Sequence, residues 1–285
     1  MPLSDRLRSP MTMEVRHLTD PAAAARELER VALDPVLDTV LLSVLDRTVA
    51  DPDTHPDRHW WLVEDRGDVV GVAFRTAPHP LGLALEPGPW LRPLVEAVLA
   101  EAPDLDAVAS VRRRAEAFAA EWVAVTGGSA RPRLQMRILE CVRLDPPADV
   151  PGAARAVRAE ELTELAAWVD AFADELALRE SAHDLEGMRA GARWWVDRDE
   201  RVSLAVHREP SRGVARVGPV YTPRQHRRRG YAAAVTAAVT RAAYDAGADR
   251  VVLYTDAANP TSNAVYERIG YRAVAEAVEL DLARG

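Results

Sequence analysis

The chain has 285 residues, of which 48% are hydrophobic and 28% are charged, and its formal net charge is -8. An acidic surface repels polyanions, so this charge argues against nucleic-acid binding and favours cationic partners. Because no apolar run reaches the ~20 residues that a membrane-spanning helix needs, we expect no contact with the membrane interior.

The first half of the chain predicts an α/β unit. Apolar residues at alternating positions indicate strands, and apolar residues three or four apart indicate helices. In chain order, we expect a strand at 13–20, a helical segment at 21–51, two strands within 59–74, a helix at 89–102, a strand at 105–110, a helix at 112–127 and a strand at 133–144.

The second half predicts a similar order of elements. In chain order, we expect a first strand in 154–162, a helix at 163–180, strands at 193–198, 201–207 and 213–222, a helix at 231–247, a strand at 249–256, a short helix from Pro260 and a last strand at 277–282. Two halves of this kind fit the two domains that the length predicts.

A sequence repeat supports this division. Residues 59–74, HWWLVEDRGDVVGVAF, resemble residues 193–208, RWWVDRDERVSLAVHR, and the two segments lie about half the chain apart. Such spacing is typical of a duplicated unit. The proline-rich segment 145–154 is the predicted linker. We therefore place a tail at 1–13, a first domain at 14–150 and a second domain at 151–285.

The segment RQHRRRGYAAAV, at 224–235, is the first candidate site. It joins an apolar strand to an alanine-rich helix, and the free N-H groups and positive dipole at a helix N-terminus attract anions, phosphate above all. The mononucleotide loop GxxxxGK[ST] is excluded because the chain contains no lysine, and no GxGxxG fingerprint occurs. A solvated basic turn is the alternative.

A second organised segment begins about 20 residues after the start of the helix at 231–247. Asn259 is placed to cap a helix with Pro260 at its first position, and Gly270 suits the position just after the helix ends. Tyr266 falls two turns into this helix, where its side chain can point toward the ends of the preceding strands.

In these two segments the sequence resembles the GCN5-related N-acetyltransferase family. The family motif [RQ]-x-x-G-x-[GA] is matched by Arg227, Gly230 and Ala232, and a later asparagine, tyrosine and glycine-aromatic pattern is matched by Asn259 and residues 266–271. The resemblance covers about residues 151–285. It implies an α/β (α+β) fold with two tandem acyl-CoA N-acyltransferase-like domains, each a mixed, mostly antiparallel sheet flanked by helices.

The resemblance also implies a chemistry: transfer of an acetyl group from acetyl-CoA, as cosubstrate, directly to an amine. Tyr266 would be the general acid that protonates the leaving thiolate, and its alternative is a packing role in the core. The implied cofactor-binding residues are Val220, Tyr221, Thr222, Arg227, Arg228, Arg229, Gly230, Tyr231, Ala232, Asn259 and Asn263.

The general base has no clear candidate. The strand at 213–222 carries no carboxylate and offers Arg216 and Tyr221 instead. A carboxylate acting through water could replace it, and the residues to consider are Asp174, Glu175 and Glu180, each of which could equally be an exposed helix charge. His207 and His226 are open between a phosphate contact and a solvated polar role.

The first half lacks both segments of the motif, so we interpret it as a degenerate copy that does not hold the cofactor. The run 112–114, RRR, is expected to be a solvated helix face. The acceptor would be a small cationic amine or a protein N-terminus, and the protein a monomer or homodimer. A non-catalytic acyl-CoA-binding regulatory module is the alternative.

Three further expectations concern the cellular compartment and bound metals. The single cysteine, Cys141, excludes an intramolecular disulfide and suits a reducing compartment. The first 20 residues carry no apolar segment of the kind found in secretory signals, so we expect a cytoplasmic protein. No histidines and cysteines cluster at metal-ligand spacing, so we expect no metal.

Overall fold

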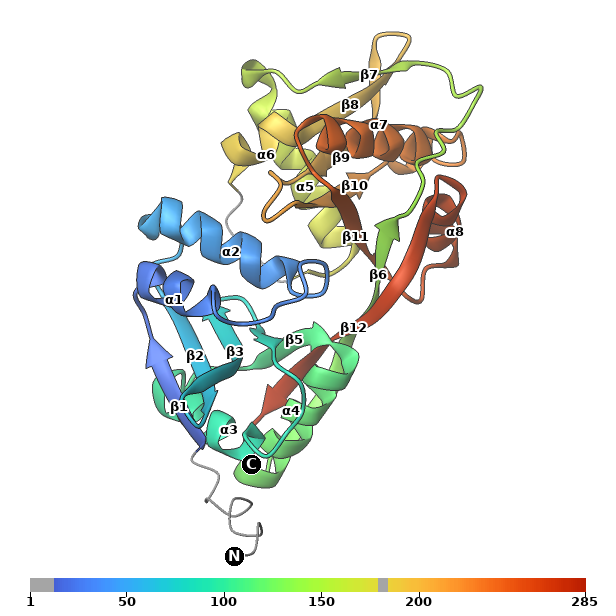
Figure 1. Ribbon diagram of the computed structural model, residues 1–285. Coiled ribbons are helices and arrows are strands. Elements are labelled where there is room, and N and C mark those ends of the chain that lie inside the picture. The colour runs from blue at the N-terminus through green and yellow to red at the C-terminus, as the bar shows by residue number, and fades with distance from the viewer. Residues whose placement is uncertain (1–12, 179–183) are drawn as a thin grey trace, which may run out of the picture. The chain divides into compact units, whose positions relative to one another are not determined.

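The computed structural model describes residues 13–178 and 184–285, in two compact units (Figure 1). The first unit contains the described residues up to Leu33, Val44–Arg133 and Val278–Gly285. The second contains Asp34–Ser43 and the described residues of Leu134–Ala277. Each unit is therefore assembled from both halves of the sequence.

The first half of the chain supplies six strands and four α-helices among the described residues. They are β1 (Met13–Leu18), α1 (Pro21–Leu28), α2 (Thr39–Ala50), β2 (Arg58–Asp65), β3 (Asp68–Thr76), β4 (Leu81–Ala84), α3 (Leu91–Glu101), β5 (Ala107–Val111), α4 (Arg112–Thr126) and β6 (Ser129–Cys141), with a 3-10 turn η1 at Pro52–Thr54.

The second half supplies the remaining elements. They are β7 (Ala153–Ala156), the 3-10 turn η2 (Ala159–Glu161), α5 (Leu162–Glu175), α6 (Leu185–Gly191), β8 (Ala192–Asp197), β9 (Glu200–His207), β10 (Val214–Tyr221), the 3-10 turn η3 (Arg224–His226), α7 (Tyr231–Asp245), β11 (Arg250–Asp256), α8 (Pro260–Arg268) and β12 (Tyr271–Ala283).

Several of these elements differ from the sequence prediction. Strand β12 begins at Tyr271, six residues before the strand expected at 277–282. The single helical segment expected at 21–51 is two helices, because Pro35 disfavours helical backbone at the residue before it and Asp34 instead accepts the N-H groups of Val36 and Leu37. Strand β4 and helix α6 are short and had no clear periodic signal.

Both units contain a mixed, mostly antiparallel sheet, as predicted. In the first unit the strands follow the order β1-β2-β3-β4-β5-β12, and the β4–β5 pair is parallel. In the second unit the order is β12-β6-β11-β10-β9-β8-β7, and the β10–β11 pair is parallel. The parallel pair lies inside each sheet, with antiparallel hairpins beside it.

Strands β6 and β12 each belong to both units. Strand β6 begins in the first unit and continues from Leu134 in the second, whereas β12 begins in the second unit and continues from Val278 in the first. The expected single boundary near residue 150 therefore differs from the division of the structure. The physical reason is pairing: each sheet takes a strand from the other half of the chain.

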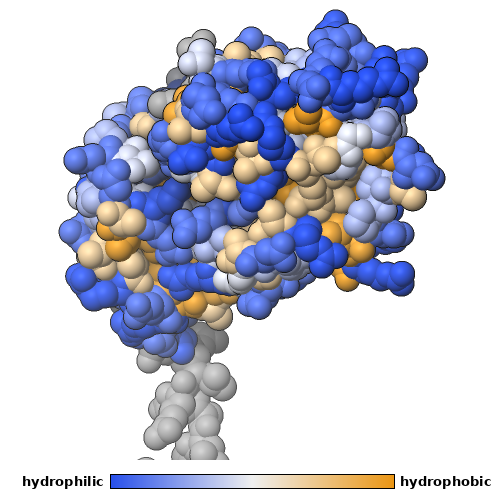
Figure 2. All heavy atoms as spheres, turned by 90° about the horizontal axis from the view of Figure 1, so that it is seen from above, coloured by the Kyte–Doolittle hydropathy of each residue, from blue (hydrophilic) through white to orange (hydrophobic). Residues whose placement is uncertain are grey.

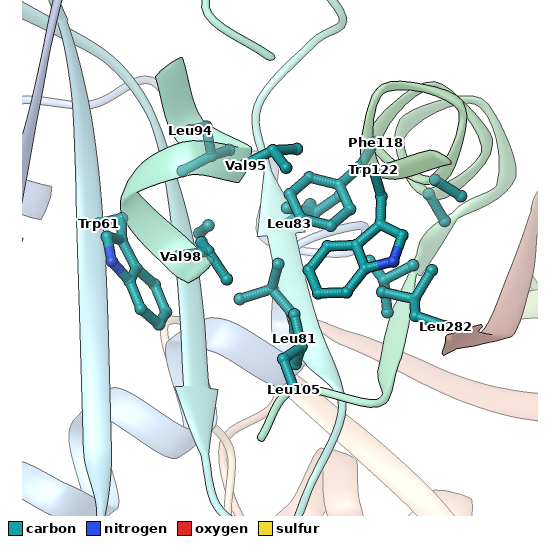
Figure 3. Close-up of a cluster of buried hydrophobic side chains, with 14 of the residues drawn as sticks. Trp61, Leu81, Leu83, Leu94, Val95, Val98, Leu105, Phe118, Trp122 and Leu282 are labelled. Atoms are coloured by element: carbon teal, nitrogen blue, oxygen red, sulfur yellow. The ribbon is translucent and has the colours of Figure 1, made fainter. Parts of the chain in front are cut away.

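The core of the first unit lies beside helices α3 and α4 (Figure 3). Its side chains come from β2, β4, α3, α4 and the end of β12, and include the fully buried Trp61, Phe118 and Trp122. Burying an aromatic or branched side chain contributes about 1.5–3 kcal/mol. The C-terminal strand is therefore part of the first unit's hydrophobic stabilisation.

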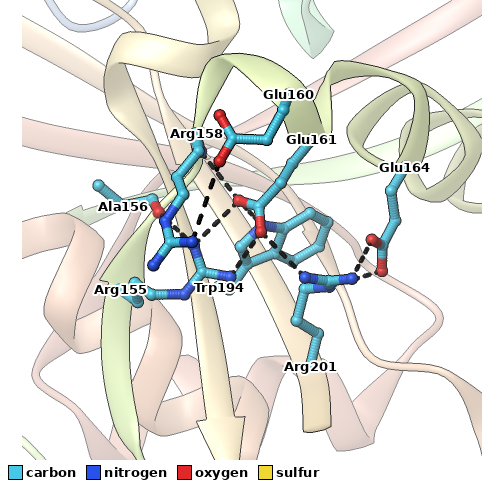
Figure 4. Close-up of polar contacts among 8 residues, drawn as sticks. All are labelled: Arg155, Ala156, Arg158, Glu160, Glu161, Glu164, Trp194 and Arg201. Atoms are coloured by element: carbon cyan, nitrogen blue, oxygen red, sulfur yellow. Dashed lines mark hydrogen bonds and ion pairs between the residues drawn. The ribbon is translucent and has the colours of Figure 1, made fainter. Parts of the chain in front are cut away.

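The second unit has a core on each face of its sheet. Successive strand residues point to opposite faces, and Trp194 packs with the residues of α5 and α6 while Trp195 packs with those of α7. On the α5 face, Glu161 accepts bonds from Arg155 (2.7 and 2.9 Å), Trp194 (3.2 Å) and Arg201 (2.9 Å), as Figure 4 shows. This ion-pair hub holds the start of α5 against β8 and β9.

In the face seen in Figure 2, hydrophilic side chains surround smaller apolar patches. Among residues 13–178 and 184–285, no helix combines the length and the apolar character needed to cross a bilayer.

Candidate functional site

Strands β10 and β11 separate at the centre of the second sheet. Their parallel pairing runs from Val214 opposite Arg250 to Val217 opposite Leu253, and no later pair joins them within the described residues. Strand β10 still pairs with β9 as far as Tyr221, after a bulge that follows Val217. One edge of β10 beyond Val217 thus lacks a strand partner and could bind an extended ligand backbone.

The chain leaves this opening into a tight loop. Turn η3 is followed by two residues with left-handed backbone, Arg228 (φ 64°) and Gly230 (φ 83°), and α7 starts at Tyr231. In the part of the chain that the structure describes, no side chain caps this N-terminus. Its free N-H groups, beside three exposed arginines, make it suited to an anion.

Glycine is required at position 230 for two reasons. Its φ of +83° is a conformation that other residues rarely adopt, and an added Cβ would lie 2.9 Å from the Cγ2 of Val150. The motif glycine therefore sets the direction in which the loop enters α7.

Arg227 ties the loop to two other elements. Its Nε donates to the Thr222 carbonyl (2.8 Å), and its Nη2 donates to Oε2 of Glu175 at the end of α5 (2.5 Å). The hydrogen bond from Arg227 lowers the pKa of the Glu175 carboxyl. The predicted partners Arg228 and Arg229 are exposed on the same loop.

Residues on either side of the β8–β9 turn contact the loop before α7 and the first residue of that helix. The Tyr231 hydroxyl donates to Oδ2 of Asp197 (2.7 Å), and Nε2 of the buried His226 lies 3.3 Å from Oε1 of Glu200. The Tyr231 side chain is buried in the unit, so its predicted cofactor contact is limited to its backbone N-H. His226 is an internal residue of the loop and not a solvated one.

Helix α8 starts and ends at the predicted residues. The Asn259 side chain accepts the Ser262 N-H (3.1 Å), Pro260 occupies the first turn, and Gly270 follows the helix with a φ of +99°. The amide of Asn263 donates to the carbonyls of Asp256 (3.2 Å) and Asn259 (2.9 Å). Asn263 therefore fixes the turn between β11 and α8, and its buried Oδ1 has no partner among the described residues.

Tyr266 packs against the same hydrophobic cluster as Val220, a residue of β10 beyond the point where its pairing with β11 ends. Its ring meets Tyr271 edge-to-face, with 6.2 Å between centroids. Burial raises the pKa of Tyr266 to about 12, and its hydroxyl has no hydrogen-bond partner among the residues described. The Tyr271 hydroxyl, by contrast, is bonded to Thr240 (2.6 Å). Tyr266 thus keeps a proton that is free for transfer.

The three carboxylates considered as the general base differ in their surroundings. Asp174 is exposed, Glu175 is paired with Arg227, and Glu180 lies outside the described residues. His207 is buried, which lowers its pKa, and its Nδ1 lies 3.1 Å from the Arg208 carbonyl. Of these residues, Glu175 is the one that the structure joins to the candidate site.

Two residues near the site were missed by the sequence analysis. Ser203 is fully buried, and its hydroxyl donates to the Tyr221 carbonyl (3.1 Å) and lies 2.7 Å from Oγ1 of Thr222. Trp168 of α5 meets the Tyr221 ring edge-to-face at 5.7 Å. A serine among the buried residues of an apolar strand was the available signal for Ser203.

The corresponding place in the first unit is closed by its own side chains. After the parallel β4–β5 pairing, the Leu83 carbonyl accepts hydrogen bonds from Ser110 Oγ (2.7 Å) and Arg114 (3.4 Å), and Arg114 Nε donates to Glu86 (3.1 Å). Arg114 is buried, so the expectation of a solvated RRR run is wrong at this residue. A carboxylate here, which repels phosphate, fits the interpretation of a degenerate copy.

No group of three or more metal-ligating side chains is brought together within 13–178 and 184–285. Arg216 lies on β10, the strand without a carboxylate, and its Nη1 donates to the Ser43 hydroxyl (3.3 Å).

Comparisons with known proteins agree with this geometry. Residues 198–279, which include the β9–β10 hairpin, the loop and α8, match the family model described as FR47-like protein. A comparison with curated proteins found no match.

Several solved structures share the fold. A GCN5-related N-acetyltransferase from Kribbella flavida is 23% identical over 76% of this chain and 88% of its own, with a TM-score of 0.56. One from Sphaerobacter thermophilus is 17% identical and covers 95% of both chains, with a TM-score of 0.58. A tandem GNAT protein from the clavulanic acid biosynthesis pathway is 14% identical over 95% of this chain and 98% of its own, with a TM-score of 0.57.

These likenesses extend over both units, whereas the family-model match lies in the second half. With the parted strands and the anion loop in that half, the chain has the fold of the GCN5-related N-acetyltransferases.

Proposed function

We propose that the second unit binds acetyl-CoA and transfers its acetyl group to an amine. The observation that carries this proposal is the parting of β10 and β11 directly before an uncapped helix N-terminus. An extended pantetheine arm could pair with the free edge of β10, and a pyrophosphate could meet the N-H groups of the loop at Gly230. The fold supports acyl transfer in general, and the acetyl donor and amine acceptor are the specific part of the proposal.

Within this proposal, the residues on β10 and the loop bind and orient the donor. Gly230 allows close approach of the backbone, and Arg228 and Arg229 supply charge-assisted contacts to phosphate oxygens. Asn259 and Asn263 hold the start of α8, which carries Tyr266. The Thr222 carbonyl is already bound by Arg227, so Val220 is the better candidate for a backbone contact to the donor.

The transfer step balances with the groups present. The neutral amine nitrogen attacks the thioester carbon, and a C-N bond forms as the C-S bond breaks. The leaving sulfur receives a proton from the Tyr266 hydroxyl, which regains one from solvent. The surplus proton on nitrogen passes to water or a carboxylate. With its pKa raised to about 12, Tyr266 is protonated at neutral pH. The same burial would raise the pKa of a thiolate formed beside it and so help the proton transfer.

A thiol-release assay tests this function. Acetyl-CoA is incubated with a library of small amines and peptide N-termini, and free thiol is measured. In the proposed enzyme, Tyr266→Phe should lower kcat by about 10²-fold while acetyl-CoA binding changes little. The matched control is Tyr244→Phe, because the Tyr244 hydroxyl is bonded to the Cys141 carbonyl and serves only the core (3.2 Å).

The alternative is a non-catalytic acyl-CoA-binding module, and the lack of a carboxylate on β10 favours it. Coenzyme A binding without thiol release for any amine would support that module. Turnover unaffected by Tyr266→Phe would remove Tyr266 from the chemistry and leave the transfer itself in place.

A further inference from the structure

Helix α5 presents an aromatic ring and a carboxylate to the end of β10. Trp168 and Glu175 are seven residues apart, which places them two turns apart on one helix face. Trp168 contacts the Tyr221 ring edge-to-face at 5.7 Å, and Glu175 binds Arg227 at 2.5 Å. One stripe of α5 therefore faces both the free strand end and the anion loop.

The Glu175–Arg227 ion pair is exchangeable. The two side chains are 35% and 37% exposed, and a pair so open to solvent stabilises a protein only weakly. A pyrophosphate group carries more negative charge than a carboxylate and can accept two parallel N-H bonds from a guanidinium. It would therefore compete with Glu175 for Arg227, which starts the motif on this loop.

We propose that the pyrophosphate of acyl-CoA takes Arg227 from Glu175, and that the released carboxylate binds the ammonium group of an acceptor with an apolar or aromatic body. The ring of Trp168 and the Tyr221 ring that it meets would contact that body. This inference rests on the proposed function of the second unit. Donor binding would then strengthen acceptor binding, because the donor removes the Arg227 side chain that otherwise occupies the carboxylate.

The charges around Glu175 are consistent with this exchange. Arg227 and Arg224 both lower the pKa of Glu175, and Arg227 has the larger effect. Arg224 is exposed, so solvent screens its charge. When Arg227 moves to a phosphate, Glu175 loses its main cationic partner and becomes available to an ammonium group.

Calorimetric titration with coenzyme A tests the exchange. Glu175→Gln removes the partner of Arg227 before coenzyme A binds. We therefore expect this variant to bind coenzyme A about two- to five-fold more tightly than the unaltered protein, since an exposed ion pair contributes about that much to an equilibrium. The control is Glu164→Gln, which removes a carboxylate in the first turn of the same helix, where it pairs with Arg201. Unchanged or weaker binding by Glu175→Gln would mean that the pair only holds the loop, and would overturn the exchange.

The same titration separates this inference from the proposed function. If the unaltered protein does not bind coenzyme A, the proposed function fails. If it binds and Glu175→Gln is no tighter, only the inference fails. Thermal unfolding followed by circular dichroism checks that both variants are folded. Glu175→Asp retains the charge, so it should bind coenzyme A with the affinity of the unaltered protein.

The acceptor half is tested with phenethylamine, and phenethyl alcohol serves as its neutral counterpart. With saturating coenzyme A, the unaltered protein should bind the amine about two- to five-fold more tightly than it does without coenzyme A, because the coupling between the two ligands is reciprocal. Glu175→Gln should lose that gain, and the alcohol should show none. Equal binding of amine and alcohol, or no effect of coenzyme A, would contradict the assignment of Glu175 to the acceptor.

Discussion

At the scale of single residues, three tyrosines of the second unit differ in what their hydroxyls bind. Burial raises the pKa of all three, to about 12 for Tyr244 and Tyr266 and well above its usual value for Tyr271. Tyr244 and Tyr271 have hydrogen-bond partners in the core, at Cys141 and Thr240. A raised pKa therefore does not identify the acid. The unpaired hydroxyl of Tyr266, on a residue that packs against the same cluster as Val220, supports its proposed role, and the kinetic effect of Tyr266→Phe belongs to this scale.

A second residue-scale prediction concerns Gly270. Gly270→Ala should destabilise the protein by at least about 2 kcal/mol, because the left-handed φ of +99° is combined with an added Cβ only 1.7 Å from the Arg143 carbonyl oxygen. Gly247 has a similar φ of +93° and open space around it, so Gly247→Ala should cost only about 1 kcal/mol. Urea unfolding of both variants measures the difference, and equal losses would mean that the steric contact is relieved.

At the scale of elements, the Glu161 hub decides where α5 begins. Glu161 receives bonds from β7, β8 and β9 through Arg155, Trp194 and Arg201. The hydrogen bond from Arg155, first among these causes, lowers the pKa of Glu161 from 4.5 to about 2. Because α5 also carries Trp168 and Glu175, the hub sets the position of the proposed acceptor residues.

The hub predicts a specific acid sensitivity. A carboxyl with a lower pKa in the folded protein favours folding when ionised, so its contribution of about 2 kcal/mol is complete above pH 4.5 and is lost as the pH falls toward 2. Glu161→Gln should lower stability at neutral pH and remove this part of the pH dependence. Glu160→Gln is the control, since that side chain is 70% exposed. Parallel pH profiles for Glu161→Gln and the unaltered protein would refute the assignment.

At the scale of the whole molecule, β12 makes the first unit depend on the end of the chain. Val278, Leu280 and Leu282 are buried in the first unit's core, and the Leu282 N-H donates to the Asp106 carbonyl (2.7 Å). The first unit is therefore incomplete without residues 278–285. Strand β6 has the reverse role in the second sheet, beside β11.

Leu282→Ala should destabilise the first unit by about 2–4 kcal/mol, because it leaves a cavity in a packed core. Hydrogen exchange should then speed up at the amides of β4 and β5, far away in sequence. Val274→Ala, on the same strand but 43% exposed, should change stability by less than about 0.5 kcal/mol. If exchange changed only in the second unit, the end of β12 would not stabilise the first.

Local features of the fold were predictable because their causes are local. The cap at Asn259, Pro260 in the first turn and Gly270 after the helix act within a few residues, and the structure has them where expected. The break before α2 was missed although Pro35 signals it. The burial of Arg114 could not be predicted, because its partners Leu83 and Glu86 lie on another element.

The sequence by itself determined the type of fold, the order of most elements and the loop at Arg227 to Ala232, since periodicity, capping and turn chemistry are encoded in short segments. Only the tertiary structure decided which strands pair across the two halves, that β10 and β11 part after Val217, and that Arg227 meets Glu175. These are contacts between residues far apart in sequence. They depend on packing and strand register, which no single segment specifies.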